Sequence, residues 1–276
     1  MFADATLAAR IDRAEGRLCA DIATIVGIRH PQRQSIVLPI SGGLAVFVSR
    51  SSPVNKVIGL ALDTALDLDA LRRIESEWDS RGEPVRVELS VLADPGAGRV
   101  LTERGYQLHG FENVLGLALD ATPAGPAEMT SIPVEVIGDD QLRAWADIAI
   151  EAFLNLDGTG SVPDEGFSRE QLAGTLNEVT SAPGFVRYLA RVDGEAVGEA
   201  AMRIDGDLAQ MAGAGTLPRA RGRGVQKALI QRRLADARAA GCTLAVVTTA
   251  PGTRSQDNVM RRGFELLYAR AILVRD

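Results

Sequence analysis

Apolar residues in the second half of the chain follow two spacings, one typical of helices and one typical of strands. Between residues 225 and 240 the apolar positions recur every three or four residues, which predicts an amphipathic helix. Gly241 is suited to end that helix. Residues 244–247 then form a continuous apolar run, which is typical of a buried strand. This alternation of helix and strand indicates an α/β fold.

Upstream of this helix the pattern predicts hairpins. Residues 185–192 and 197–204 have the composition of strands, and the Asp193-Gly194 sequence between them favours a tight turn. A second turn at 205–207 leads into a strand over 208–215, and helical patterns precede the first strand. We therefore expect a mixed, mostly antiparallel sheet flanked by helices.

The first half of the chain repeats part of this order. Both halves contain a strand, a turn and a glycine followed by an aromatic residue. These elements are 85–90, 94–96 and Gly105 in the first half, and 244–249, 251–252 and Gly263 in the second. The spacing from strand end to glycine differs by one residue, so either the fold is duplicated or the similarity arose by chance. Duplication predicts domains at 1–122 and 132–276, joined by a linker at 123–131 that contains proline and glycine.

The loop between the strand over 208–215 and the helix over 225–240 has the composition of an anion site. It contains Arg219, Arg221 and Arg223, with Gly222 between the last two and Gly224 directly after them. Glycines allow the backbone to approach a phosphate closely, and the first N–H groups of a helix lack intrahelical partners. The helix dipole adds partial positive charge there. A solvated basic turn is the alternative interpretation.

The order of these elements resembles that of the GCN5-related N-acetyltransferases (GNAT). In that family the loop reads Arg/Gln-x-x-Gly-x-Gly/Ala and binds the pyrophosphate of acetyl-CoA. Arg221 and Gly224 match its first two fixed positions, whereas Gln226 stands where the family has a small residue. Asn258 matches the asparagine that contacts the pantetheine arm, and Gly263-Phe264 matches the turn that follows.

The resemblance implies two GNAT-like domains and an acyl-CoA-dependent N-acetyltransferase. The acetyl group would pass from acetyl-CoA directly to an amine in a ternary complex. The residues implied in cofactor binding are Thr216, Leu217, Arg221, Gly222, Arg223, Gly224, Val225, Gln226 and Asn258. The backbone at Thr216 and Leu217 corresponds to the part of the family's strand that pairs with the pantetheine arm and polarises the thioester.

Candidate catalytic residues are fewer. The attacking amine must lose a proton, and Glu199 on the predicted strand over 197–204 is our candidate base. The family's usual general acid is a tyrosine, but the corresponding residue here is Val259, which cannot donate a proton. Tyr268 is our candidate substitute, with Tyr188 or solvent as alternatives.

The first domain lacks the counterpart of the anion loop. At the equivalent place the sequence contains Asp63, Asp67 and Asp69 and no arginine, and each carboxylate would repel a phosphate by about 1 kcal/mol near a surface. We therefore expect a degenerate N-terminal copy that does not bind CoA.

Composition narrows the class of protein further. The net charge of −6 argues against a nucleic-acid partner, and the positive charge is concentrated at the loop and at Arg232 and Arg233, which suits a small polyanion. No apolar run approaches the ~20 residues of a membrane span. There is no signal-peptide pattern, and Cys19 and Cys242 are expected to be buried free thiols, so we expect a cytoplasmic protein. Two histidines are too few for a common metal site.

Three functions therefore compete. The first is an active N-acetyltransferase acting on a small-molecule or peptide amine. The second is a non-catalytic acyl-CoA binding or sensing protein, which Val259 favours. The third is an interaction scaffold in which the loop is merely basic. The sequence leaves the acceptor, the acyl chain length and the oligomeric state open.

Overall fold

The structure, a computed structural model, describes residues 3–119, 131–155, 168–180 and 182–276. Its internal contacts separate the chain into two units that interleave along the sequence. Unit 1 contains Leu115–Leu176 and Gly184–Glu265. Unit 2 contains Phe2–Val114, Asn177–Pro183 and Leu266–Asp276.

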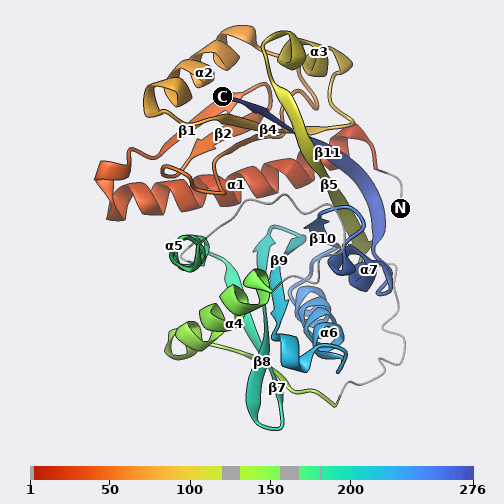
Figure 1. The fold of residues 1–276 in the computed structure, drawn as a ribbon. Coiled ribbons are helices and arrows are strands. Elements are labelled where there is room, and N and C mark those ends of the chain that lie inside the picture. Colours follow the sequence, from red (N-terminus) through yellow and green to blue (C-terminus); the bar gives the residue numbers. More distant parts are fainter. Residues whose placement is uncertain (1–2, 120–130, 156–167, 181) are drawn as a thin grey trace. The chain divides into compact units, whose positions relative to one another are not determined.

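Unit 2 is a mixed sheet between helices (Figure 1). The strand order is β1-β2-β3-β4-β11-β5, with β3 and β4 parallel and β11 antiparallel to β4. Helix α1 covers one face, and α2 and α3 cover the other. The elements are α1 (Ala5–Arg29), η1 (Pro31–Arg33), β1 (Ile36–Ile40), β2 (Gly43–Phe47), β3 (Lys56–Ile58), α2 (Leu68–Arg81), β4 (Val85–Ser90), α3 (Pro95–Glu103), β5 (Gln107–Ala118) and β11 (Glu265–Arg275).

The two faces of this sheet bury different kinds of side chain. Toward α2 the contacts are apolar. The rings of Phe47 and Trp78 pack edge to face, with their centroids 5.8 Å apart. Burial of each such large side chain stabilises the fold by about 1.5–3 kcal/mol. Toward α1 the sheet presents charged residues, which the same helix matches with buried or half-buried acids.

Arg270 of β11 is the centre of this charged layer, and its side chain has no exposed surface. Its Nη2 lies 2.5 Å from Oδ1 of Asp12. Its Nη1 lies 2.7 Å from Glu15, 3.3 Å from Glu88 and 3.2 Å from Glu112. We call Asp12, Glu15, Glu88 and Glu112 the acidic cluster. A buried cation surrounded by four carboxylates ties β11 to α1, β4 and β5.

Lys56 and Tyr268 complete the layer. Nζ of Lys56 lies 3.0 Å from Glu15 and 2.8 Å from Glu88, and the Tyr268 hydroxyl donates to Asp12 at 2.6 Å. Burial opposes ionisation of Glu15, but the charges of Arg270 and Lys56 outweigh it and lower the pKa of Glu15 to about 2. At Glu112 burial prevails, with repulsion from Glu88 and Glu15, and raises the pKa to about 7. The positive charges of Arg270 and Lys56 therefore do not stabilise the ionised form of every carboxyl in the acidic cluster.

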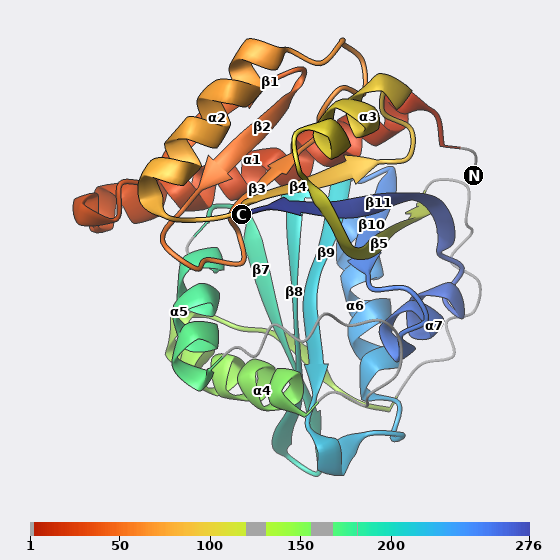
Figure 2. The same ribbon diagram turned by 45° about the horizontal axis from the view of Figure 1, so that its top comes forward.

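The strands of unit 1 continue the same hydrogen-bonded order as β5-β10-β9-β8-β7-β6. Figure 2 shows β7, β8 and β9 side by side. Strands β6 to β9 are antiparallel neighbours, and β9 and β10 are parallel. The elements are β6 (Val134–Val136), η2 (Asp139–Gln141), α4 (Leu142–Leu154), α5 (Arg169–Val179), β7 (Phe185–Val192), β8 (Glu195–Asp205), β9 (Leu208–Thr216), η3 (Pro218–Ala220), α6 (Val225–Ala239), β10 (Leu244–Thr249) and α7 (Arg254–Met260).

Two glycines let helices approach this sheet from opposite faces. A Cβ on Gly198 of β8 would collide with Val225 at the start of α6. A Cβ on Gly215 of β9 would lie 2.6 Å from the Cβ of Ala152 on α4. Gly215 is the register partner of Glu199, which follows Gly198 in the chain, and neighbouring strand residues face opposite sides. Helices α6 and α4 therefore pack on opposite faces of unit 1.

The expected fold class, a mixed α/β sheet flanked by helices, is confirmed. The units depart from a simple division of the chain in two places. The closing strand, expected in the second domain, pairs with β4 in unit 2, with Arg270 opposite Ser90. The last residues of β5, from Leu115 onward, belong to unit 1, and Leu119 N–H donates to Thr243 O at 2.8 Å. The charge of Arg270 supplies a reason for the first departure, since only unit 2 contains its acids. Most of the expected linker lies outside the described residues.

Replacing Arg270 by methionine tests this explanation. Arg270→Met leaves the acidic cluster without its main cation, so we expect the free energy of unfolding to fall by about 3–5 kcal/mol in urea denaturation. The matched control is Arg275→Met on the same strand, where the lost partner is Asp79 at 3.5 Å and both side chains are partly exposed. We expect the control to lose less than about 1 kcal/mol. Equal losses would contradict the central role of Arg270.

Candidate functional site

Strands β9 and β10 part from each other in the middle of unit 1. Within the described residues their parallel register covers only Leu208–Gln210 opposite Leu244–Val246. Strand β9 continues to Thr216, still paired with β8 but no longer with β10. The register with β8 shifts between Ala200 and Ala201, and Gly213 nearby has a positive φ of 47°. The second half of β9 thus has one backbone edge that β10 leaves open.

The loop after β9 leads to an N-terminus of α6 that no side chain caps within the described part of the chain. The N-cap is Gly224, with φ of 87°, and Gly222 has φ of 76°, a conformation that favours glycine. Among the described residues, a Cβ added to Gly222 would meet no atom within 4 Å, and one added to Gly224 would meet only Ile132 Cδ1, at 3.9 Å. Within this part of the chain, the space in front of the first turn of α6 is therefore unfilled.

Most other helix starts in the described chain are closed by their own side chains. In α2 the Asp67 carboxylate accepts from the N–H groups of Asp69 and Ala70, both at 3.0 Å. Asp4, Asp94 and Thr253 cap α1, α3 and α7 in the same way. The start of α2, which follows β3 as α6 follows β9, thus carries a covalently attached anion where α6 has glycine.

The three arginines of the loop have different partners. Arg221 is half-buried and donates to two main-chain carbonyls, from Nε to Thr216 O at 3.3 Å and from Nη2 to Asn155 O at 2.5 Å. It therefore links the end of β9 to the end of α4. Arg219 forms an ion pair with Glu195, and Arg223 with Asp193 at 3.0 Å.

Arg232 and Arg233, which the sequence groups with the loop, have structural partners instead. Arg233 is buried, and its Nη1 donates to Ala201 O at 3.1 Å and to Gly213 O at 3.4 Å, on either side of the irregular register. Burial lowers its pKa to about 10 against the opposing charge of Glu199. Arg232 pairs with Asp236 at 3.0 Å. The sequence pattern did not reveal that Arg233 stabilises the bulge, because the contact is long-range.

Glu199 is buried on the α4 face of β8, next to the open half of β9. An atom added to Gly215 as Cβ would lie 2.8 Å from its Oε1, and its Oε2 has no hydrogen-bond partner among the described residues. Burial raises the pKa of Glu199 to about 7, although Arg233 and the Gly215 backbone act to lower it. Near neutral pH this carboxyl can both accept and release a proton.

The predicted cofactor residues divide into backbone, core and surface positions. Leu217 N–H donates to Val197 O at 2.9 Å, so that group already has a partner in β8. Because backbone groups of successive strand residues alternate between edges, those of Thr216 face the edge that β10 leaves. Val225 is buried against β8, whereas Gln226 is half-buried in the first turn of α6.

Asn258 is half-buried on α7, next to the buried Val259 of the unit 1 core. Tyr268 lies in unit 2, where burial and Asp12 raise its pKa. Tyr188 lies in unit 1 on β7, and its ring is buried. The structure thus brings the loop, Thr216 and Glu199 into one unit, and it does not bring Tyr268 into that unit.

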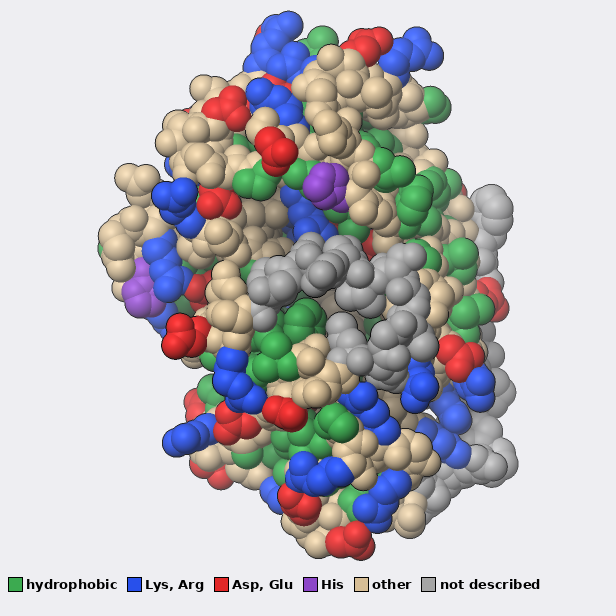
Figure 3. Space-filling model, in the orientation of Figure 1, with side chains coloured by type: hydrophobic (Ala, Val, Ile, Leu, Met, Phe, Trp, Pro, Cys, Tyr) green, Lys and Arg blue, Asp and Glu red, His purple; other side chains and the backbone are tan. Residues whose placement is uncertain are grey.

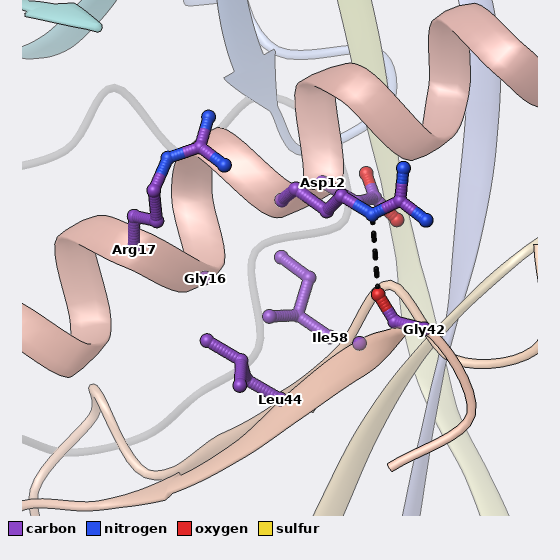
Figure 4. A pocket seen from close by; sticks show the side chains of 8 residues that line it. Asp12, Gly16, Arg17, Gly42, Leu44 and Ile58 are labelled. Carbon is purple, nitrogen blue, oxygen red and sulfur yellow. Dashed lines mark hydrogen bonds between the residues drawn. The ribbon is translucent and has the colours of Figure 1, made fainter. Parts of the chain in front are cut away.

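A pocket of about 210 Å³ lies in unit 2 between α1 and the start of β2 (Figure 4). Its apolar lining includes Leu44 and Ile58. Arg13 at its edge donates from Nε to Gly42 O at 3.3 Å and pairs with Asp63. The guanidinium of Arg13 thus has partners within unit 2. The pocket therefore differs from the start of α6, where the helix N-terminus has no side-chain cap among the described residues.

Comparison with known proteins agrees with the fold of the chain. Residues 143–264 match the model of the Acetyltransferase (GNAT) family. A GCN5-related N-acetyltransferase from Kribbella flavida superposes with a TM-score of 0.64 at 20% identity, over 97% of this chain and 95% of that one. The chain has the GNAT fold.

Two further structures with the GNAT fold are similar over most of their length. A tandem GNAT protein from the clavulanic acid biosynthesis pathway, solved without acetyl-CoA, gives a TM-score of 0.59 at 12% identity, covering 92% of this chain and 87% of that one. A GNAT-family acetyltransferase from Colwellia psychrerythraea gives 0.52 at 14% identity, with 90% and 88% covered. No curated protein matches the chain significantly.

The described residues contain no group of three or more histidine, cysteine, aspartate or glutamate side chains placed to hold a metal ion. None of the helices in the same residues combines the length and apolar character needed to cross a membrane. Cys19 and Cys242 are both buried free thiols.

The buried Glu199 gives a prediction for stability against pH. In the folded state its pKa is about 7, above its ordinary value of 4.5, so folded protein keeps a proton that unfolded protein loses. This contribution is present at pH 4.5 and is lost as the pH rises through 7, by about 3 kcal/mol. In urea denaturation at pH 5 and pH 8, we expect Glu199→Gln to show a smaller fall in the free energy of unfolding than wild type. Glu195→Gln, on the same strand but exposed, should keep the wild-type fall; an unchanged fall in Glu199→Gln would show that Glu199 does not carry the proton.

Proposed function

We propose that unit 1 binds acetyl-CoA and transfers its acetyl group to an amine. One observation carries the proposal: the N-terminus of α6 is uncapped, rich in glycine and arginine, and follows a strand whose edge is open. Backbone N–H groups at such a terminus, together with the helix dipole, favour a phosphate. The GNAT fold and the family match over residues 143–264 support the assignment.

The residues of unit 1 fit the parts of CoA in order. The pyrophosphate would meet the backbone of Gly222 to Gln226, with Arg221 holding the loop between Thr216 and Asn155. The pantetheine arm, which carries amide groups, would pair with the open edge of β9 near Thr216. Asn258 would contact the same arm from α7. Val225 contributes by packing the start of α6 against Gly198.

Glu199 is our proposed general base. The amine nitrogen attacks the thioester carbonyl carbon, its proton passes to the Glu199 carboxylate directly or through water, and the C–S bond breaks to release CoA thiolate. A base with a pKa of about 7 suits this step near neutral pH. The N–H of Thr216, which faces the open edge, is the proposed donor to the thioester oxygen.

The leaving thiolate takes its proton from solvent in this proposal. Val259 is apolar, and the Tyr268 hydroxyl already donates to Asp12 within unit 2. We therefore assign Tyr268 to the charged layer of unit 2 instead of acid catalysis. The valine also favours a second candidate function, an acyl-CoA binding protein without turnover.

Unit 2 is proposed to be a degenerate GNAT-like copy without a CoA site. The Asp67 carboxylate, which occupies the start of α2, supports this proposal. The acceptor is proposed to be a small-molecule or peptide amine.

Gly224→Ala tests the CoA site. In calorimetric titration with acetyl-CoA we expect one site per wild-type chain, and at least tenfold weaker binding to the variant, because its Cβ enters the space in front of the first turn. The matched control is Gly241→Ala at the other end of α6, where φ is also positive, at 80°. Both variants should lose about 1–2 kcal/mol of stability through the same backbone strain, but only the first should lose CoA affinity.

Absence of acetyl-CoA binding to wild type would refute the proposed function. Two acetyl-CoA sites per chain would refute the proposal that unit 2 does not bind CoA. Binding without turnover on any amine tested would leave the second candidate in its place.

Glu199→Gln tests the base. We expect kcat/KM of wild type to rise with pH through about 7 and then level off, because the carboxylate must be ionised to accept a proton. In Glu199→Gln this rise should disappear and the rate should fall at least about 100-fold. Acetyl-CoA affinity should stay within threefold of wild type. A variant that keeps the wild-type pH profile would exclude Glu199 as the base.

A further inference from the structure

The turn between β7 and β8 places two carboxylates beside the arginines of the anion loop. Val192 and Glu195 are register partners, so Asp193 and Gly194 form a two-residue turn. Both have positive φ, 53° and 81°, as a type I′ turn requires. The turn therefore sets the backbone positions of the two acids on either side of Gly194.

Each of these acids pairs with one arginine of the loop. Glu195 pairs with Arg219, and Oδ2 of Asp193 lies 3.0 Å from Nη2 of Arg223. In both pairs the side chains are at least half exposed, with Asp193 84% exposed. Exposed pairs of this kind exchange partners at low cost.

The hydrogen bonds of Arg221 described above differ in kind. Its guanidinium donates to the carbonyls of Thr216 and Asn155, which belong to the folded backbone. Of the three loop arginines, one thus has fixed partners within the fold, and two hold carboxylates that a stronger anion can displace. In Figure 3 blue and red side chains mingle over the region of α6 and the β7–β8 hairpin.

We propose that the Asp193–Glu195 turn is an internal counter-ion of the CoA loop, which the phosphates of the ligand displace. This inference rests on the proposed function. A phosphate carries more charge and more acceptor oxygens than a carboxylate, so it competes for the same guanidinium groups. The acids keep Arg219 and Arg223 neutralised when no ligand is bound, and they make binding selective for polyphosphates over singly charged anions.

The experiment removes the two negative charges without changing the turn. Asn tolerates positive φ as Asp does, so Asp193→Asn keeps the type I′ geometry, and Glu195→Gln keeps the side-chain size. We expect the double variant to bind CoA about fivefold more tightly than wild type at low salt. The gain should shrink as salt is raised, because exposed charges are screened.

The matched control is Asp147→Asn on α4. It removes an exposed charge of unit 1 that lies 4.0 Å from Arg143 and not beside a loop arginine. We expect it to bind CoA as wild type does. Equal gains in the control and the double variant would show a general charge effect and overturn the proposal, as would wild-type affinity in the double variant.

Single variants and a second ligand separate the two pairs. Asp193→Asn reports on Arg223 and Glu195→Gln on Arg219, and dephospho-CoA lacks the 3′-phosphate. We expect at least one single variant to gain less with dephospho-CoA than with CoA. If each single variant gains the same affinity for dephospho-CoA as for CoA, the 3′-phosphate does not displace either acid. In that case only the pyrophosphate competes with the acids for the arginines.

Inorganic pyrophosphate makes the test independent of CoA. Should wild type and double variant both fail to bind CoA, the proposed function fails, and the counter-ion proposal is then decided by pyrophosphate alone. Tighter pyrophosphate binding to the double variant would support it, and equal or absent binding would overturn it.

Discussion

The ion cluster around Arg270 sets the strand order of unit 2. A guanidinium without exposed surface needs several acceptors, and its acids come from α1, β4 and β5. Burying such a charge is costly unless it is fully paired, so β11 has one suitable position in this unit. The interleaving of the two units along the chain follows from that position. The cost of the arrangement is visible at Glu112, whose pKa burial raises to about 7 for lack of further positive charge.

The two units solve the same local problem at the start of a helix in opposite ways. Helix α2 begins with Asp67, whose carboxylate satisfies two N–H groups. Helix α6 begins with Gly224, which has no side chain to offer. The first arrangement stabilises the helix within the protein, whereas the second leaves the N–H groups of the first turn without a side-chain cap among the described residues. The two helix starts differ in the residue type at the N-cap, aspartate in α2 and glycine in α6. This difference is the chemical basis for proposing that unit 1 binds CoA and unit 2 does not.

Local patterns in the sequence predicted the parts of the fold that depend on local forces. The helix over 225–239, the strand over 244–249 and the Asp193-Gly194 turn follow from spacing and turn chemistry, and the structure contains all three. The partner of β11 could not be predicted, since pairing with β4 or with a strand of the second half satisfies the same apolar pattern. The burial of Glu199 and the contacts of Arg233 with the bulge could not be predicted from the sequence for a related reason. Both depend on which side chains lie across the sheet, and a linear pattern does not contain that information.

The pairing of β11 with β4 also has a consequence for synthesis of the chain. Domains generally fold as they leave the ribosome, beginning with the N-terminal one. Here the sheet of unit 2 lacks a central strand until residue 275 has been made, after all of unit 1. Until then the carboxylates on α1 and β4 lack the pairing with Arg270. The unit that is translated first is therefore the one that is completed last, and a chain that ends before β11 contains the acids of this unit without the guanidinium that pairs with them.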